Sequence, residues 1–442
     1  MVFTGEAVIS PPKNIFVGIS LNSINIDTEE TEIMKQDIIN IMNKKNIDFI
    51  LLSGTRSSNP AINYLVPEIH MFKIFLVLRK NDIPVILYND LERDEAEATG
   101  YYMLNYNELF DYGYQPRLED SVARSTSFYR SIFNALNIQG KVSFNIVDDV
   151  SFLYLVLQQL QEQCQNIEFD LKNGANIFDY ARTTKDAEEI EAIRQAGLKT
   201  CQVFKATEDY LERCFDKNGS VVDAHGQEVT IRKIKQFIEI ESAQRGLILG
   251  MDTIFSQGRD AGVPHNTGNP EEGLKTGKSI VFDYFPHDKA SGYKFDMTRS
   301  YCLNQIPPHL KQAYHDIKTA LDIVAQKMTL GEKLQTYHNL VCDHFENQGY
   351  PTTRSNPKST SGFTHGLGHG IGLEVHELPS VGPLCEETLK PGQVFTLEPG
   401  LYFPEKGWGL RLEDIVAVTH DDQIENLTPH PKKFQLTLKP WT

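Results

Sequence analysis

Five side chains in the last third of the sequence are of types that bind metal ions. Their order along the chain is Asp283, Asp296, His369, Glu398 and Glu413. Each lies in a short apolar or glycine-rich segment, so ordered backbone would present it; the segments read FDYF, KFDMTR, HGLGHGIG, FTLEPG and GLRLED. Four carboxylates and one imidazole could hold two divalent ions that share bridging oxygens and activate a water molecule.

Strand alternation places two of these carboxylates opposite apolar side chains. In GQVFTLEPG, Phe395 and Leu397 share one face and Glu398 lies on the other. The same alternation sets Glu413 opposite the leucines of GLRLED. A carboxylate in such a position is costly to bury unless a cation compensates it. A metal ion would do so, and an ordinary ion pair, for example between Glu413 and Arg411, would do so as well.

Histidines and a turn mark the other candidate positions. Asp283 and Asp296 flank the turn-like segment HDKASGYK, which would bring adjacent strands together, although aspartates beside turns also serve as caps. The glycine-rich segment THGLGHGIGLEVHE carries His365, His369 and His376, a pattern that indicates one ligand and two acid-base or oxyanion groups. A histidine-bearing surface loop is the alternative for this segment. By itself, the histidine in GVPHNTGN has no distinguishing feature.

Composition excludes several classes of partner. The net charge is -16 and the pI is near 5.3, which argues against a nucleic-acid or anionic-membrane surface. The six cysteines form no CxxC pair, as is typical of reduced thiols. The sequence begins with no signal-peptide pattern and contains no run of 18 apolar residues. We therefore expect a soluble cytoplasmic protein.

Length and pattern predict two domains, at 1–178 and 179–442, because 442 residues exceed the usual size of a single core. The first domain alternates short strands and amphipathic helices. The expected strands are NIFVGISL, IDFILLSG and KVSFNIV, the expected hairpin is IFLVL and PVILY around RKNDI, and the expected helices are EETEIMKQDIINIMNKK and SFLYLVLQQLQEQC. An α/β arrangement follows from this alternation.

The second domain is predicted to open with a long helix and to mix helix with sheet. Thr184 is the expected N-cap of that helix. Its buried face should comprise Ile190, Ile193, Gly197, Cys201 and Phe204. The segments KSIVFDYF, GQVFTLEP and GLRLEDIVAVT are expected to be strands, and PHLKQAYHDIKTALDIVAQKM is expected to be a helix.

The order Asp, Asp, His, Glu, Glu, together with GHGIG, EPG and RLED, resembles the pita-bread metallopeptidase family over about Thr184 to Val418. That family includes methionine aminopeptidases, aminopeptidase P, prolidase and the metal-free creatinase. The resemblance implies an α+β protein in which a C-terminal pita-bread catalytic domain follows an N-terminal creatinase-like α/β domain. It also implies the site residues: the metal ligands would be Asp283, Asp296, His369, Glu398 and Glu413, and the catalytic residues His265, His365, His376, Glu398 and Arg411.

The preceding domain makes the chain similar to the aminopeptidase P and prolidase subgroup. The segment PAINYLVPEIHMFKIFLVLRKNDIPVILYND looks like the early strands of the creatinase-type domain, and methionine aminopeptidases lack that domain. One departure is that Phe285 stands where the family usually has glycine. A second is that Asp296 follows Asp283 by 13 positions, slightly more than is usual. Both departures bear on substrate preference more than on metal binding.

The resemblance implies a metallo-exopeptidase that cleaves the Xaa-Pro bond at the free N-terminus of peptides or dipeptides. A metal-bridging hydroxide would attack, Glu398 would accept its proton, and His376 would donate to the developing oxyanion. His365 and His265 would hold the amide and pass a proton to the leaving nitrogen. Manganese is the favoured metal for both sites, with cobalt, iron and zinc as alternatives. The partner is a peptide with proline at its second position, and a homodimer is expected.

Two other functions remain open at this point. One is a creatinase-like hydrolase of a small C–N substrate, and the other is a non-enzymatic binding protein on the same fold. The presence of all five ligand-type residues counts against both.

Overall fold

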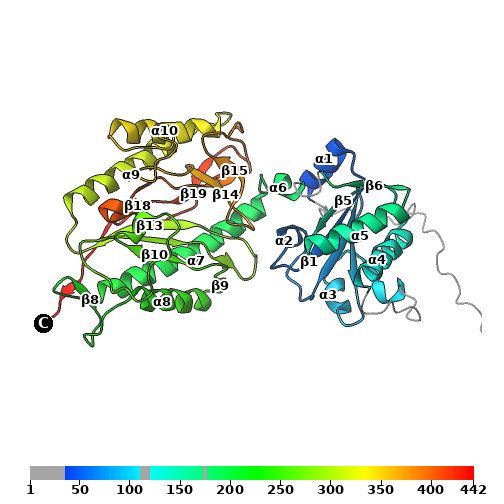
Figure 1. The fold of residues 1–442 in the computed structure, drawn as a ribbon, viewed down its shortest axis with the longest axis horizontal. Helices are drawn as coiled ribbons and strands as arrows, with labels where there is room; N and C mark the ends of the chain where they lie inside the picture. The colour runs from blue at the N-terminus through cyan, green and yellow to red at the C-terminus, as the bar shows by residue number, and fades with distance from the viewer. Residues whose placement is uncertain (1–34, 110–119, 173–176) are drawn as a thin grey trace, which may run out of the picture. The chain divides into compact units, whose positions relative to one another are not determined.

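The computed structural model describes residues 35–109, 120–172 and 177–442 (Figure 1). The strand predicted at 14–21 lies outside the described residues, as does the start of the helix predicted over 29–45. We call residues 35–172 the N-terminal region and residues 177–442 the C-terminal region, and the predicted domain boundary at 178 stays a prediction. None of the helices in the described residues combines the length and apolar character that a membrane-crossing segment needs.

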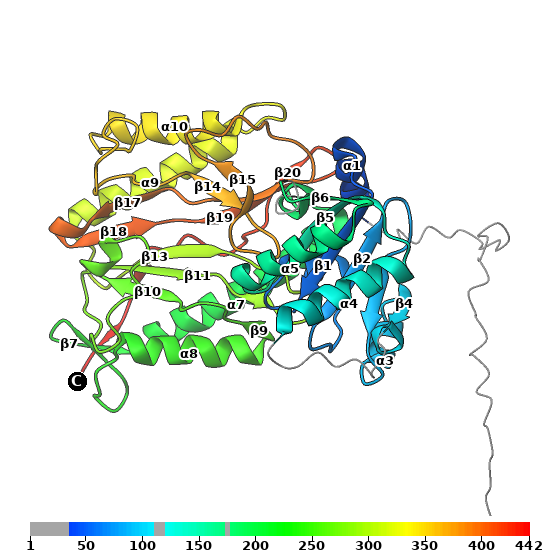
Figure 2. The same cartoon turned by 45° about the vertical axis from the view of Figure 1, so that its right-hand side comes forward.

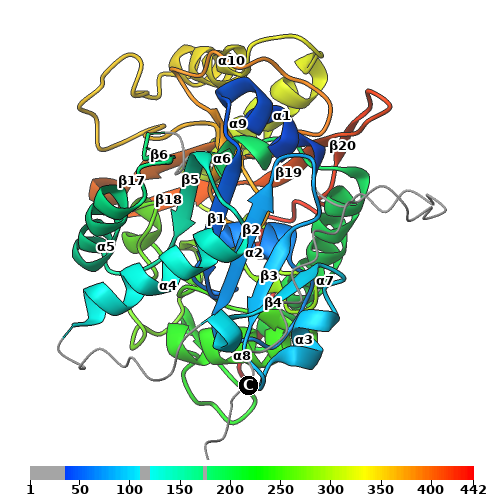
Figure 3. The same cartoon turned by 90° about the vertical axis from the view of Figure 1, so that its right-hand side faces the viewer.

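The N-terminal region contains one six-stranded sheet in the order β4-β3-β2-β1-β5-β6. Its strands are β1 Phe49–Gly54, β2 Ile74–Arg79, β3 Val85–Tyr88, β4 Tyr102–Asn105, β5 Gly140–Ile146 and β6 Ile167–Asp170. The pair β2 and β3 is antiparallel around Asn81, which has a φ of 59°, so the predicted hairpin is confirmed. The pairs β1–β5 and β5–β6 are parallel. Figure 3 shows β1, β2 and β3 side by side.

Helices cover both faces of this sheet because its central strands are apolar on both sides. In β1, Ile50 and Leu52 join the core beneath α1, α2 and α6, whereas Phe49 and Leu51 join the core beneath α4 and α5. The helices of the N-terminal region are α1 Gln36–Lys45, α2 Pro60–Leu65, α3 Arg93–Glu97, α4 Ser121–Ala135, α5 Val150–Gln163 and the 3-10 turn Tyr106–Leu109. At the start of the C-terminal region, α6 Ile177–Ala181 joins the same core as α1 and α2. The α/β character predicted from sequence is confirmed.

The long helix predicted after residue 178 is α7, Ala187–Glu212, but its predicted cap was wrong. Asp186, not Thr184, is the N-cap: its carboxylate accepts the N–H of Glu189, and the Glu189 side chain accepts the N–H of Asp186. This reciprocal capping box satisfies two helix-end donors, whereas a threonine two residues earlier reaches neither. The predicted apolar face is confirmed, with Ile193 and Phe204 fully buried.

The C-terminal region contains two principal sheets, with orders β10-β11-β13-β21 and β15-β14-β16-β19-β20, and three smaller ladders, β12-β9, β17-β18 and β22-β7-β8. Its strands are β7 Phe215–Lys217, β8 Ser220–Val222, β9 Leu247–Ile248, β10 Ile254–Gln257, β11 Ser279–Tyr284, β12 His287–Asp288, β13 Met297–Leu303, β14 Gly368–Gly370, β15 Glu377–Val381, β16 Val394–Leu397, β17 Gly400–Phe403, β18 Trp408–Arg411, β19 Asp414–Val418, β20 Ile424–Asn426, β21 Gln435–Leu436 and β22 Lys439–Pro440.

Two helix layers enclose these strands (Figure 2). The helices are α7, α8 Ile231–Gln244, α9 Pro308–Lys327 and α10 Leu334–Asn347, with 3-10 turns at Asp260–Gly262 and Pro404–Lys406. One apolar core joins α7 and α8 to β11 and β13, and another joins α9 and α10 to β16, β17 and β18. The mixed helix and sheet content predicted for the second domain is confirmed.

The segment predicted as one strand, GLRLEDIVAVT, is two strands separated by Leu412 and Glu413. β18 pairs with β17, and β19 pairs with β16 in the larger sheet. The backbone N–H of Glu413 donates to the carbonyl of Thr298 at 3.1 Å, so the chain contacts β13 as it passes from one ladder to the next. The alternation of apolar and polar residues in the sequence does not reveal this change of strand partner. The break between the two strands places Glu413 where the sheets meet.

Candidate active site

Strand β11 carries Asp283, and Asp296 directly precedes strand β13, so the two aspartates lie on one face of this pair. Their antiparallel register pairs Asp283 with Thr298 and Tyr284 with Met297, so the next position on the same face sets Phe285 opposite Asp296. The two aspartates are therefore diagonal neighbours across the ladder. Their exposed fractions are only 6% for Asp283 and 4% for Asp296. The turn between Asp283 and Asp296 brings the two aspartates close together, as the sequence predicted.

The second principal sheet supplies the imidazole and the first glutamate. His369 lies on β14, and its backbone N–H donates to Thr396 Oγ1 at 3.2 Å. Glu398 follows β16 directly, and its N–H donates to the carbonyl of Leu367 at 2.8 Å. A Cβ atom at Gly368 would lie 1.9 Å from the carbonyl oxygen of Thr396. Glycine is therefore required for the two strands to approach closely enough.

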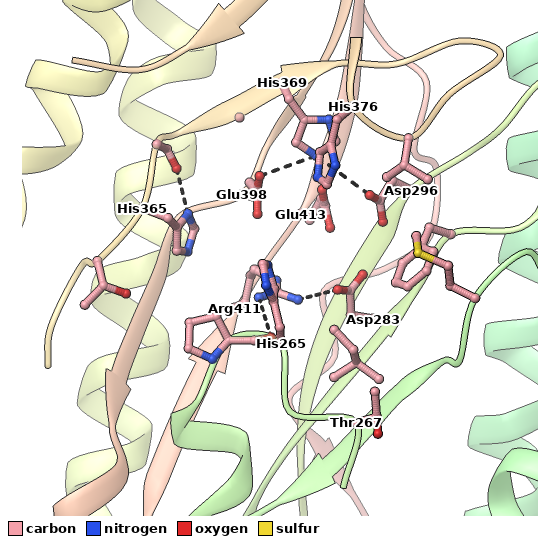
Figure 4. A pocket seen from close by; sticks show the side chains of 18 of the residues that line it. His265, Thr267, Asp283, Asp296, His365, His369, His376, Glu398, Arg411 and Glu413 are labelled. Atoms are coloured by element: carbon pink, nitrogen blue, oxygen red, sulfur yellow. Dashed lines mark hydrogen bonds and ion pairs between the residues drawn. The ribbon is translucent and has the colours of Figure 1, made fainter. Parts of the chain in front are cut away.

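The five ligand-type side chains converge (Figure 4). One ligand atom from each of Asp296, His369 and Glu413 lies within 4.8 Å of the other two. Glu398 Oε1 is 3.5 Å from His369 Nε2. Asp283 lies beside them, and one of its carboxylate oxygens forms an ion pair with Arg411. Residues that span 130 positions of sequence thus meet at one point.

This cluster carries more negative charge than the protein around it balances. Burial and the mutual repulsion of the carboxylates raise the pKa values of Asp296, Glu398 and Glu413 above the usual range. The Oδ1 atoms of Asp283 and Asp296 are buried and have no hydrogen-bond partner. Carboxylate oxygens and an imidazole that lack a counter-charge are a suitable donor set for divalent metal ions. The residues present therefore fit the metal that the sequence predicted.

Hydrogen bonding prepares His369 to act as a ligand. Its Nδ1 lies 3.1 Å from the carbonyl oxygen of Gly370, which can only accept, so Nδ1 carries the proton and Nε2 keeps its lone pair. Burial and the neighbouring His376 lower the pKa of His369 to about 4. The neutral ring therefore directs an unprotonated nitrogen toward the carboxylates, as metal-binding histidines require.

Two buried hydroxyl groups that the sequence did not single out hold Arg411 and Glu413 in place. Thr298 Oγ1 donates to Glu413 Oε2 at 2.8 Å and accepts from Arg411 Nε at 3.0 Å. Arg411 Nη1 also donates to the Tyr402 hydroxyl at 3.0 Å. Thr298 could have been found, because it lies two positions after Asp296 on the same strand face. Tyr402 gave no comparable signal.

His365 has both ring nitrogens engaged. Nδ1 lies 2.7 Å from the carbonyl oxygen of Gly366 and therefore donates, and Nε2 accepts from the Tyr402 hydroxyl at 3.0 Å. Burial and the charge of Arg411 lower the pKa of His365 to about 3, so the ring is neutral. With both ring nitrogens engaged, His365 can hold the Tyr402 hydroxyl and the Gly366 carbonyl in position.

His376 and His265 are the two more exposed histidines of the site. The ring of His376 meets that of His369 edge to face, with centroids 4.3 Å apart. Burial, followed by the effect of His265, lowers the pKa of His376 below its usual value. Both rings are thus placed to contact a ligand bound over the carboxylates.

The loop that carries His376 is anchored by Glu377, whose side chain is only 2% exposed. The Glu377 carboxylate accepts from Arg182 Nη1 at 3.1 Å and from Lys185 Nζ at 2.9 Å. It also accepts the backbone N–H of Leu373 at 2.9 Å. Burial opposes its ionisation, but the charges of Lys185 and Arg182 prevail and hold the pKa of Glu377 below its usual range.

All nine predicted site residues line one cavity of about 810 Å³. They are Asp283, Asp296, His369, Glu398, Glu413, His265, His365, His376 and Arg411. A cavity over a carboxylate cluster, with histidines and one arginine around it, can hold a carbonyl compound against bound metal and supply protons to it.

Comparison with known proteins accords with this geometry. Residues 191–420 match metallopeptidase family M24. The putative dipeptidase YkvY of Bacillus subtilis is 33% identical over 201 residues, which are 44% of this chain and 50% of that protein. An Xaa-Pro dipeptidase of Pyrococcus horikoshii is 25% identical over 390 residues, 86% of this chain and 93% of that protein.

Among solved structures, the X-Pro aminopeptidase of Thermotoga maritima superposes with a TM-score of 0.69 at 20% identity, covering 91% of this chain and 99% of that one. The protein belongs to metallopeptidase family M24. Its fold is the pita-bread fold that the sequence predicted.

Proposed function

We propose that the protein is a dinuclear-metal exopeptidase that releases the first residue from peptides or dipeptides of the form Xaa-Pro. The observation that carries this proposal is the meeting of Asp283, Asp296, His369, Glu398 and Glu413 in one cavity with two unpartnered carboxylate oxygens. Membership of family M24 and the similarity to an Xaa-Pro dipeptidase support it. The five side chains would bind the metal ions, and His265, His365, His376, Glu398 and Arg411 would be catalytic.

When bound, the two divalent ions would lower the pKa of a water molecule and polarise the scissile carbonyl. Glu398 would accept the proton of the attacking water on a carboxylate oxygen. Arg411 would keep the Asp283 carboxylate in position through their ion pair and the Glu413 carboxylate through Thr298. We propose manganese as the metal, because oxygen donors outnumber the single imidazole; cobalt, iron and zinc are the alternatives.

Three histidines would act on the substrate. His376, beside His369, would donate a hydrogen bond to the carbonyl oxygen as it gains negative charge. His265 would pass a proton to the leaving nitrogen. His365 would fix the position of the scissile amide through its contact with Tyr402, because both of its ring nitrogens are already engaged. The nitrogen of an Xaa-Pro bond carries no hydrogen, so the site must fit the proline ring.

The expected setting is a cytoplasmic homodimer. All six cysteines, which lie within the described residues, are free thiols, which supports a reducing compartment. The dimer is carried over from the resemblance to the aminopeptidase P and prolidase subgroup.

The test is hydrolysis of an Xaa-Pro dipeptide beside an Xaa-Pro-Yaa-Zaa tetrapeptide, after the metal content has been measured. Release of the first residue from either substrate, with no cleavage of the N-acetylated form, is the expected result. Equal cleavage of blocked and free peptides would contradict an exopeptidase. Faster turnover of Xaa-Ala than of Xaa-Pro would contradict proline selectivity, and Phe285 would then be the first residue to examine.

A further inference from the structure

A second cavity, of about 710 Å³, adjoins the candidate active site. The two cavities share the lining residues Met251, Phe285, Val375 and His376. The two cavities therefore adjoin along these four side chains. We call it the side cavity.

The register of one hairpin continues from the metal-binding positions into the side cavity. His287 pairs with Lys294 in the same register that pairs Asp283 with Thr298, so Asp283, Phe285 and His287 share a face with Asp296 and Lys294. The opposite face holds Phe282 and Phe295 in the apolar core. Two strand positions, roughly 7 Å, separate Lys294 from Asp296 along the chain. The hairpin thus presents carboxylates at one end and basic side chains at the other.

The side cavity carries unbalanced positive charge. Lys294 is partly exposed, and within the described residues its ammonium group makes no hydrogen bond or ion pair, although Glu374 and Asp296 attract it from farther away. Arg56 also lines the cavity and donates to the carbonyl of Val66 at 2.8 Å. Lys289 lines it as well. An anion would complete this charge arrangement.

Acidic side chains do not supply that anion from the walls. Glu374 is the one acidic residue among the described residues that line the side cavity, and its carboxylate is 2.6 Å from Arg182 Nη2. His287 adds a further polar group, because its Nδ1 is buried and has no hydrogen-bond partner. The lining therefore offers two lysines and one arginine against a single carboxylate, which Arg182 already engages.

The position of the side cavity identifies which part of a peptide would reach it. His265, His365 and Arg411 line the active-site cavity but not the side cavity. Under the proposed function, His265 and His365 act at the scissile amide and its leaving nitrogen, on the proline side of the bond. The side cavity therefore lies toward the first residue, and Met251, Phe285 and Val375 can pack against the aliphatic part of its side chain.

We propose that the side cavity binds the side-chain carboxylate of an acidic first residue, with Lys294 as its principal partner. This inference rests on the proposed function and adds a substrate class to it: peptides that begin Glu-Pro or Asp-Pro. Phe285, opposite Asp296, forms the shared wall along which the side chain passes. The neutral isostere Gln-Pro would leave Lys294 unpaired and would bind less tightly.

The experiment uses the full-length, metal-loaded protein and compares kcat/KM for Glu-Pro and Gln-Pro. A charge-assisted hydrogen bond in a partly solvated site predicts a preference of about 10-fold for Glu-Pro, expressed mainly in KM. K294M and K294Q should bring the ratio close to one. K311M is the matched control, because Lys311 is an exposed lysine on α9, and it should keep the wild-type ratio. Having two variants at position 294 guards against a folding defect in one of them.

Each other outcome is decisive. A wild-type ratio near one, with Gln-Pro hydrolysed, would overturn the inference and leave the proposed function intact. A ratio that survives in both Lys294 variants would overturn the assignment of Lys294. The C-terminal carboxylate of the substrate is the other group that the side cavity could bind, and Gln-Pro with an amidated C-terminus tests this. If amidation lowers the rate, and if that loss disappears in the Lys294 variants, the cavity binds the C-terminal carboxylate instead. If no Xaa-Pro substrate is hydrolysed, the proposed function and this inference both fail.

Discussion

Glu413 and Asp414 are neighbours in sequence and equally buried, at 2% exposure each, yet their surroundings are opposite. Glu413 faces the carboxylates of the cavity, and burial together with the charge of Asp283 raises its pKa. Burial also disfavours the charge on Asp414, but Arg299 and Lys432 outweigh that effect and hold the pKa of Asp414 below its usual range. Burial alone therefore does not explain the difference.

The cluster around Asp414 is complete within the protein. Arg299, fully buried, donates from Nη2 to Asp414 Oδ1 at 2.9 Å. Asn426 donates to Asp414 Oδ2 at 2.8 Å, and Lys432 Nζ lies 2.5 Å from the same oxygen. Among the described residues that line the cavity, Arg411 is the one lysine or arginine beside the four carboxylates. Side chains of the protein itself neutralise Asp414, so we expect its role to be structural. The carboxylates of the cavity lack such partners, so we expect a bound cation to neutralise them.

The largest effect should follow from removing a predicted ligand. E413Q keeps the size of the side chain but removes its charge, so we expect turnover of an Xaa-Pro substrate to fall by about 1000-fold or more, together with loss of bound metal. Turnover and metal content measured on the same preparation test this expectation. Wild-type activity with an unchanged metal content would remove Glu413 from the ligand set.

A smaller loss is expected at His376, which contacts the substrate in the proposed mechanism without binding metal. H376A should lower turnover by about 100- to 1000-fold while the metal content stays near that of the wild type. A fall in turnover without a loss of bound metal would distinguish His376 from Glu413. If H376A hydrolyses Xaa-Pro at the wild-type rate, His376 plays no part in stabilising the oxyanion.

The balanced cluster should respond in stability. D414N leaves the buried Arg299 short of a counter-charge and should lower the free energy of unfolding by about 3 kcal/mol. Urea denaturation measures this change, and D421N, at an exposed position, is the matched control. A D414N protein as stable as the control would show that the ion pair contributes nothing net.

The smallest expected effect has a sign that depends on the metal. In chelated protein, D296N relieves repulsion from Glu413 and Asp283, so unfolding should cost about 1 kcal/mol more than in the wild type. In metal-loaded protein the same change removes a ligand, and the thermal midpoint should fall. Thermal unfolding with and without chelator tests both signs. Destabilisation in both states would show that the cluster carries no excess charge when metal is absent.

Much of the site was predictable because its signals are local. Alternation placed Glu398 opposite Phe395 and Leu397, and both leucine and phenylalanine are buried as expected. The turn after Asp283 and the glycines around His369 mark close approaches of backbone that are visible in sequence alone. The strands β2, β3 and β5 and the helices α5, α7 and α9 were predicted for the same reason.

The parts that could not be predicted depend on contacts between distant residues. The N-cap is the exception, because the capping box of Asp186 and Glu189 is local and the prediction of Thr184 missed it. The break before Asp414 follows from a change of strand partner. Tyr402 meets His365 across 37 positions of sequence, which no periodicity encodes.

The most direct test is to measure metal content and Xaa-Pro hydrolysis together, on freshly purified protein, after chelation and after adding manganese. Five ligand-type side chains in one cavity predict about two divalent ions per chain, lost on chelation together with activity and regained with it. Freshly purified protein that contains no metal and still hydrolyses peptides would contradict that prediction.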